Sequence, residues 1–215
     1  MAEKQLLTQE IDFRPARPSD GTLASRLLFD TFPRKVTFII GLGDEIRAKK
    51  ILSEIFSIPG HRLSCEFAQI VMYEGRVAGM VIVFPGKLIG KLNRRLNKLI
   101  HRQYSFRGKL ALILRVWPLV FLKETTRDEF FLSNLVVRKK FRGRGVAEKL
   151  LMHVEAQAKG AGFSKLALMV DLDNQVAKGF YDQHGYAVKA INLESNSRAP
   201  YLGPGYQRRV KDLSS

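Results

Sequence analysis

Two arginines alternate with two glycines directly before a helical pattern, at Arg142, Gly143, Arg144 and Gly145. Neighbouring arginines repel each other, and a glycine costs a helix about 1 kcal/mol relative to alanine. A bound anion would compensate for both. The first turn of a helix offers free N–H groups and a dipole that attracts negative charge, and glycines let a phosphate approach the backbone. The segment therefore predicts a phosphate-binding loop at a helix N-terminus.

Two common phosphate-binding motifs do not match this loop. A dinucleotide-binding fingerprint would need glycine at position 148, where the chain has Glu148. A P-loop would end in Gly-Lys-Ser or Gly-Lys-Thr, whereas this loop continues as Gly-Val-Ala-Glu-Lys. The pattern that does fit is Arg-x-x-Gly-x-Ala, from Arg142 to Ala147.

The elements that must position the loop follow from hydrophobic periodicity. Helices are expected at 21–32, 44–56, 87–102, 146–159 and 174–184. Extended segments are expected near the start of 11–20, in a hairpin at 65–85, and at 129–137, 165–172, 186–191 and 205–213. An early hairpin and a late strand–helix–strand unit indicate an α+β, or mixed α/β, sheet.

Positive charge is concentrated in one part of the chain. The net charge is +16, and the segment from Gly75 to Lys123 contains eleven Lys and Arg residues but no Asp or Glu. Within it, 87–102 forms a basic amphipathic helix, whose apolar stripe runs through Leu88, Leu92 and Leu96. The excess suggests an acidic partner, such as a phosphate-bearing cofactor, nucleic acid or an anionic membrane, or else a solvated basic face.

The remaining composition indicates a cytoplasmic, soluble protein. The single cysteine, Cys65, fits a reducing compartment. The N-terminus does not read as a signal peptide, and the most apolar segment, 110–122, has 13 residues and is too short to span a bilayer. The four histidines are scattered without ligand spacing, so no metal site is expected.

The Arg-x-x-Gly-x-Ala loop, in its strand–loop–helix–strand setting, resembles the acetyl-CoA pyrophosphate loop of the GNAT superfamily of N-acetyltransferases. The later segment from Asn174 to Tyr186 is similar to that family's Asn-x6-Tyr-x3-Gly-Phe/Tyr pattern. The resemblance covers 13–32, the hairpin at 65–85 and 129–190. It implies a single GNAT-like domain over 1–215, with a basic helical insertion at about 86–128. It also implies a mostly antiparallel twisted sheet with helices on its sides and two strands splayed at the coenzyme site.

The resemblance also implies roles for individual residues. The coenzyme A moiety of acetyl-CoA, the expected co-substrate, would bind to Leu135, Val136, Val137, Arg142, Gly143, Arg144, Gly145, Val146, Ala147, Asn174 and Tyr181. The strand end would contact the pantetheine arm and the loop would hold the pyrophosphate. Tyr181 would protonate the departing thiolate, and a backbone N–H of Val136 or Val137 would meet the oxyanion. The alternatives are that Tyr181 is a half-buried core residue and Asn174 only a helix cap.

The base that deprotonates the amine is not evident. Relatives that acetylate ribosomal-protein N-termini carry a glutamate where this chain has Met169. Glu129, Asp171 and Glu66 are the candidate replacements, and a water chain is the alternative.

Three functions therefore compete. The first is acetyl transfer from acetyl-CoA to a primary amine by direct attack in a ternary complex. Because of the positive charge, an anionic or neutral acceptor is expected. The second is a non-catalytic acyl-CoA-binding or sensor protein on the same fold. The third is a basic module that binds nucleic acid or a membrane surface. The oligomeric state, including a homodimer, is left open.

Overall fold

The computed structural model describes residues 11–116, 123–195 and 197–214. The N-terminal stretch before residue 11 and residues 117–122, which complete the apolar segment 110–122, lie outside the described residues.

Within the described residues, seven strands form one sheet in the order β1-β2-β3-β4-β5-β7-β6. They are β1 (Ile11–Pro15), β2 (Ala68–Tyr73), β3 (Arg76–Pro85), β4 (Phe130–Val137), β5 (Lys165–Asp171), β6 (Ala187–Leu193) and β7 (Gly205–Asp212). Every neighbouring pair is antiparallel except β4 and β5, which are parallel. This confirms the expected mixed, mostly antiparallel sheet.

Helices lie on both faces of the sheet. They are α1 (Gly21–Thr31), α2 (Pro33–Ile39), α3 (Glu45–Phe56), α4 (Ile89–Arg102), α5 (Phe106–Val116), α6 (Val146–Gly160), α7 (Gln175–Gln183) and α8 (Ala199–Leu202). The five helices expected from periodicity are confirmed as α1, α3, α4, α6 and α7. The short α2 and α8 were not predicted, since they are too short to show a helical period. The helix α5 lies inside the segment 86–128 that was expected to be helical, although its own bounds were not predicted.

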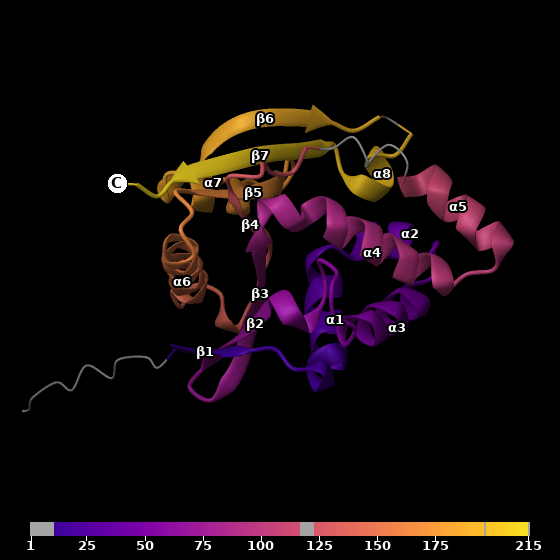
Figure 1. The fold of residues 1–215 in the computed structure, drawn as a ribbon, viewed down its shortest axis with the longest axis horizontal. Helices are drawn as coiled ribbons and strands as arrows, with labels where there is room; N and C mark the ends of the chain where they lie inside the picture. Colours follow the sequence, from indigo (N-terminus) through magenta and orange to yellow (C-terminus); the bar gives the residue numbers. More distant parts are fainter. Residues whose placement is uncertain (1–10, 117–122, 196, 215) are drawn as a thin grey trace, which may run out of the picture.

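The alternation of side chains along the strands builds two cores. On β3, Met80 and Ile82 point to one face and Val81 and Val83 to the other, as the period of two requires. The first face packs against α1, α3 and α4, and the second face against α6 and α7. Figure 1 shows α6 on one side of β3 and β4, with α1, α3 and α4 on the opposite side.

Candidate active site

The two parallel strands β4 and β5 pair over only three residues. Phe130–Leu132 lie opposite Leu166–Leu168, and the pairing stops there. The register on β3 shifts at the same place, because Val83 lies opposite Leu132 and Ile82 lies opposite Asn134. Ser133 is thus an extra, bulged residue at the point where β4 leaves β5. A bulge bends its strand, which accounts for the gap that opens between the two C-terminal ends.

The hydrogen-bond pattern determines which backbone groups of β4 face this gap. Arg138 donates its N–H to the Ala78 carbonyl oxygen at 2.8 Å. In an antiparallel ladder such pairs alternate along the strand, so Val136 also directs its N–H and C=O toward β3. Leu135 and Val137 direct theirs the other way, into the gap. Of the two residues predicted from the sequence as oxyanion donors, only Val137 directs its N–H into the gap. Val137 is therefore the remaining candidate.

The same reasoning applies to β5. Leu172 donates its N–H to the Gly205 carbonyl oxygen at 3.0 Å. The even-numbered residues of β5 therefore direct their backbone N–H and C=O groups toward β7. The backbone groups of Met169 and Asp171 consequently face β4 across the gap. An extended chain with amide groups, placed between the two strands, would find hydrogen-bonding partners on both sides.

The Arg-Gly loop lies at the open end of the gap. Gly143 and Gly145 both adopt left-handed backbone conformations, with φ of 71° and 72°. A Cβ atom added at either position would meet nothing within 4 Å. The first hydrogen bond of α6 runs from the Lys149 N–H to the Gly145 carbonyl oxygen at 3.0 Å. The N–H groups at positions 146–148 therefore lack partners within the helix, as required for an anion site.

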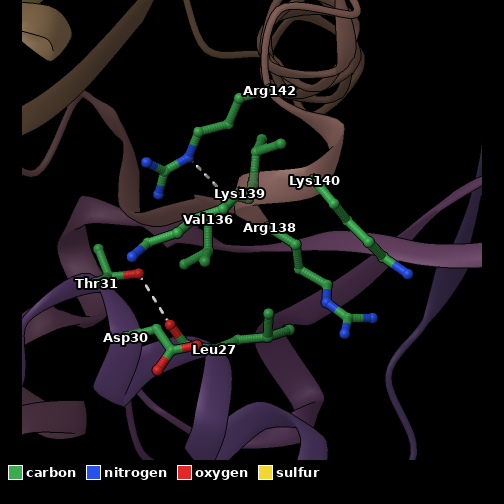
Figure 2. A pocket seen from close by; sticks show the side chains of 9 residues that line it. Leu27, Asp30, Thr31, Val136, Arg138, Lys139, Lys140 and Arg142 are labelled. Atoms are coloured by element: carbon green, nitrogen blue, oxygen red, sulfur yellow. Dashed lines mark hydrogen bonds between the residues drawn. The ribbon is translucent and has the colours of Figure 1, made fainter.

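A cavity of about 290 Å³, here called the basic cavity, lies beside this loop. Its lining consists of Leu27, Asp30, Thr31, Val136, Val137, Arg138, Lys139, Lys140 and Arg142. Figure 2 shows the basic side chains that follow β4 on one side and the end of α1 on the other. Four cations and one carboxylate make this wall suitable for a phosphate-bearing ligand.

The two arginines of the loop point to different places. Arg142 lines the basic cavity and donates from Nε to the Val137 carbonyl oxygen at 3.2 Å. The Arg144 guanidinium lies 5.6 Å from the centre of the Tyr73 ring. Arg142 is therefore the one of the pair that the fold presents to the cavity.

A second cavity of about 320 Å³, here called the mixed-charge cavity, lies at the C-terminal end of β5. Residues 31–35, Asp171, Asp173, Asn174 and 201–203 line it, and Thr31 is common to both cavities. Lys35 forms an ion pair with Asp171, and Arg34 lies 3.6 Å from Asp173. Burial lowers the pKa of Lys35, and the nearby Asp171 opposes this shift.

Asn174 caps α7. Its side-chain oxygen accepts a hydrogen bond from the Ala177 N–H at 3.1 Å, and the same residue lines the mixed-charge cavity. The cap interpretation of Asn174 is thus confirmed, while a contact with pantetheine stays a prediction.

Tyr181 is 8% exposed and belongs to the core of the second face. Its ring lies edge-on to that of Tyr186, with centroids 5.4 Å apart, and it lines neither of the two cavities. Burial raises the pKa of its hydroxyl, which keeps the group protonated. The helix that carries it is held by the buried Arg209, which pairs with Asp182 and donates to the Lys178 carbonyl oxygen at 3.3 Å.

Glu129 lies at the other end of β4 from the loop, directly before the strand. One carboxylate oxygen pairs with Arg208, and the other accepts hydrogen bonds from the Thr125 hydroxyl at 2.8 Å and the Thr126 N–H at 2.7 Å. Burial raises the pKa of this carboxyl, but these partners outweigh it and leave the pKa below its ordinary value. Glu66, the third carboxylate candidate, accepts from the Gly60 N–H at 2.8 Å.

One cluster beside the bulge was not anticipated. Arg62 holds Glu124 through two hydrogen bonds of 2.6 and 2.7 Å and donates to the Ser133 hydroxyl at 3.1 Å. It also donates to Asn93 of α4 at 3.3 Å. The cluster joins α4 to the bend in β4. Glu124 is the first acidic residue after the acid-free stretch, which is the one sequence signal that could have drawn attention to it.

Comparisons with known proteins agree with this architecture. A sequence model of the acetyltransferase (GNAT) family matches residues 49–186. The "GCN5-related N-acetyltransferase 4, chloroplastic" of Arabidopsis thaliana is 38% identical over 70 residues, and this match spans 33% of the chain but only 23% of that relative.

Solved structures share the fold at low sequence identity. An N-acetyltransferase from Staphylococcus aureus Mu50 superposes with a TM-score of 0.70 and 18% identity, over 93% of this chain and 100% of the other. A further structure, described as an acetyltransferase, has a TM-score of 0.68 and 22% identity, over 94% and 100%. At such identities the likeness concerns the fold.

Proposed function

Because the chain belongs to the acetyltransferase (GNAT) family, we propose that it transfers the acetyl group of acetyl-CoA to a primary amine by direct attack in a ternary complex. The observation that carries the proposal is the parting of β4 and β5 at Ser133, with the glycine loop of α6 at the open end. A gap in which β4 and β5 no longer pair with each other, ending in an anion site, matches a ligand that has an amide-containing arm and a pyrophosphate.

The loop supplies the site for the pyrophosphate. The free N–H groups at 146–148 and the helix dipole attract negative charge, and Gly143 and Gly145 leave open space above the backbone. Arg142 adds a positive charge on the wall of the basic cavity. Leu135 and Val137 offer backbone groups to the pantetheine amides, and Asn174 stands at the far side of the gap.

The protein contributes to the chemical step by orienting the reactants, stabilising the oxyanion and protonating the thiolate. The strands orient the thioester beside the amine, which removes most of the entropic barrier of a two-molecule reaction. The Val137 N–H stabilises the oxyanion as the amine attacks the carbonyl carbon. Tyr181 is the proposed general acid for the thiolate, on the strength of the Asn-x6-Tyr pattern that it completes with Asn174.

The amine must lose a proton before or during the attack. Asp171 lines the mixed-charge cavity beside the gap, although its carboxylate is paired with Lys35. Both oxygens of Glu129 are occupied by Arg208, Thr125 and Thr126. We therefore favour Asp171, or water held in its cavity, over Glu129 as the proton acceptor.

The test is release of free thiol from acetyl-CoA with a panel of polyamines, amino acids, aminoglycosides and peptides. We expect acceptor-dependent release with at least one class, accompanied by acetylation of the amine in a mass spectrum. Tight binding of acetyl-CoA without release on any acceptor would instead support the non-catalytic acyl-CoA-binding protein.

A further inference from the structure

The outward face of α5 is apolar. Phe106, Leu110, Ile113 and Leu114 are 82%, 53%, 48% and 69% exposed. At about 100° of rotation per residue, these four side chains fall within roughly one third of the helix circumference. Together they form one continuous stripe, here called the α5 stripe. In Figure 1, α5 lies at one end of the long axis of the molecule.

The opposite side of α5 is attached to the body of the protein. Leu112 is fully buried in the core of the first face. Arg115 donates to the Phe38 carbonyl oxygen of α2 at 2.6 Å, and its guanidinium lies 4.5 Å from the centre of the Phe38 ring. These contacts determine the rotation of the helix, so the stripe faces outward because of specific packing.

Cations flank the stripe. By the same helical rotation Arg107 borders it on one side and Lys109 on the other, and both are exposed. The preceding helix α4 exposes five more cations, at Lys91, Arg94, Arg95, Lys98 and Arg102. The sequence from 75 to 123 contains no acidic residue that would neutralise them.

We propose that the α5 stripe and its flanking cations dock the protein on an anionic phospholipid membrane surface. Apolar side chains bordered by Lys and Arg match the boundary between acyl chains and negative headgroups. None of the described helices is long and apolar enough to cross a membrane, so the helix would lie in the plane of the surface. The inference does not depend on the acyl-transfer chemistry.

Charge and side-chain type distinguish this partner from two others. A second copy placed on the stripe would bring two strongly basic surfaces together, which like-charge repulsion opposes. A nucleic acid would satisfy the cations but offer little to Leu110, Ile113 and Leu114, because single strands bind through aromatic stacking. An anionic lipid surface offers partners to both the apolar side chains of the α5 stripe and its flanking cations.

The experiment is sedimentation of the full chain with large vesicles of phosphatidylcholine, with and without 30% phosphatidylglycerol. We expect binding only to the anionic vesicles, and weaker binding as salt rises. The variant Leu110→Asp/Leu114→Asp should bind at least about tenfold more weakly, since it loses two inserted side chains and gains two negative charges. Replacing Arg107 and Lys109 with Gln should weaken binding about fivefold for each cation removed.

A matched control uses Ile46→Asp, because Ile46 is 82% exposed but lies on α3. This variant should bind anionic vesicles like the parent, and circular dichroism should show that all variants are folded. Equal binding by the parent and the Leu110→Asp/Leu114→Asp variant would overturn the proposal. So would a dimer that this variant dissociates, or binding to DNA without binding to anionic vesicles.

Discussion

The ammonium group of Lys35 on α2 forms an ion pair with the carboxylate of Asp171 at the end of β5. Both side chains are mostly buried, and the Lys35 Nζ also lies 4.4 Å from the centre of the Tyr206 ring. The pair ties a helix of the first face to the strand that borders the gap. Asp171 therefore helps to shape the mixed-charge cavity, in addition to any part it takes in proton transfer.

We expect Asp171→Asn to lower kcat, because the favoured proton acceptor is lost, to raise the KM for the amine acceptor, and to lower the free energy of unfolding by about 1–3 kcal/mol. The energetic range lies between the values for exposed and for buried ion pairs. The affinity for coenzyme A, measured by calorimetry, should stay unchanged. Asp173→Asn is the matched control, because its partner Arg34 is 3.6 Å away and both side chains are exposed. Equal effects of the two variants on the acceptor KM would contradict a special role for Asp171.

The glycine loop can be tested with substitutions at the two ends of one helix. Gly145 precedes α6 and Gly162 follows it, both have positive φ, and a Cβ at either position would meet nothing within 4 Å. Alanine at each should therefore cost a similar 1–2 kcal/mol of stability, roughly the price of a left-handed conformation. Only Gly145→Ala should weaken coenzyme A binding, by about 10–100-fold if a charge-assisted hydrogen bond is lost. If calorimetry gives the same coenzyme A affinity for Gly145→Ala and Gly162→Ala, the loop is not the pyrophosphate site.

Tyr181→Phe removes one hydroxyl from the core. If Tyr181 protonates the thiolate, turnover should fall by roughly 100-fold while coenzyme A binding persists. Because burial raises the pKa of Tyr181, its acid form persists above the ordinary value near 10, so the parent should show no alkaline loss of turnover from this group below about pH 10. Tyr186→Phe is the control, since its hydroxyl donates to Glu155 at 2.9 Å. Unchanged turnover in Tyr181→Phe would assign this residue to packing alone.

The buried pair of Glu129 and Arg208 should contribute to stability rather than to chemistry. Glu129→Ala should lower the free energy of unfolding by about 3–5 kcal/mol, because it leaves the Arg208 charge buried without a partner. The exposed neighbour Asp128 provides the control, as Asp128→Asn should change stability much less than Glu129→Ala at neutral pH. Urea unfolding measures both.

The same pair predicts a pH dependence. The pKa of Glu129 is lowered in the folded state, so its stabilisation is complete above the ordinary value of 4.5 and is lost as pH falls through the folded value. In Glu129→Gln this part of the acid-induced loss should be absent. Parallel stability curves for the parent and Glu129→Gln between pH 6 and pH 3 would contradict the assignment.

The basic face of α4 should influence the choice of acceptor. Its cations would repel a polyamine, so we expect anionic or neutral acceptors to react faster than spermidine, with rates that fall as salt rises. Replacing Lys91, Arg94, Arg95 and Lys98 with Gln should remove this preference. The parent and this fourfold variant are compared by their kcat/KM with the best soluble acceptor. If the two values agree at low and at high salt, α4 serves only solubility or surface binding.

The sequence alone was sufficient for features that depend on neighbouring residues. The glycines of the loop, the periodicity of α6 and the Asn174 cap are local, since each rests on a spacing of a few residues that fixes backbone conformation or a helix face. The mixed sheet also followed, because alternating and helical periods succeed each other in a recognisable order. These features were enough to predict a phosphate-binding loop and to find the family that the chain resembles.

Only the tertiary structure decided what lies around the gap. Strand register determines the bulge at Ser133 and the direction of the Val136 and Val137 backbone groups. Packing against neighbouring elements determines the burial of Tyr181. Lys35 and Asp171 are 136 positions apart in the sequence, so no local sequence pattern could relate them. The outward face of α5 is likewise set by Leu112 and Arg115, which contact other elements. Such contacts depend on how the whole chain packs, because the free energy of an ion pair or a buried side chain is determined by what the rest of the fold places beside it.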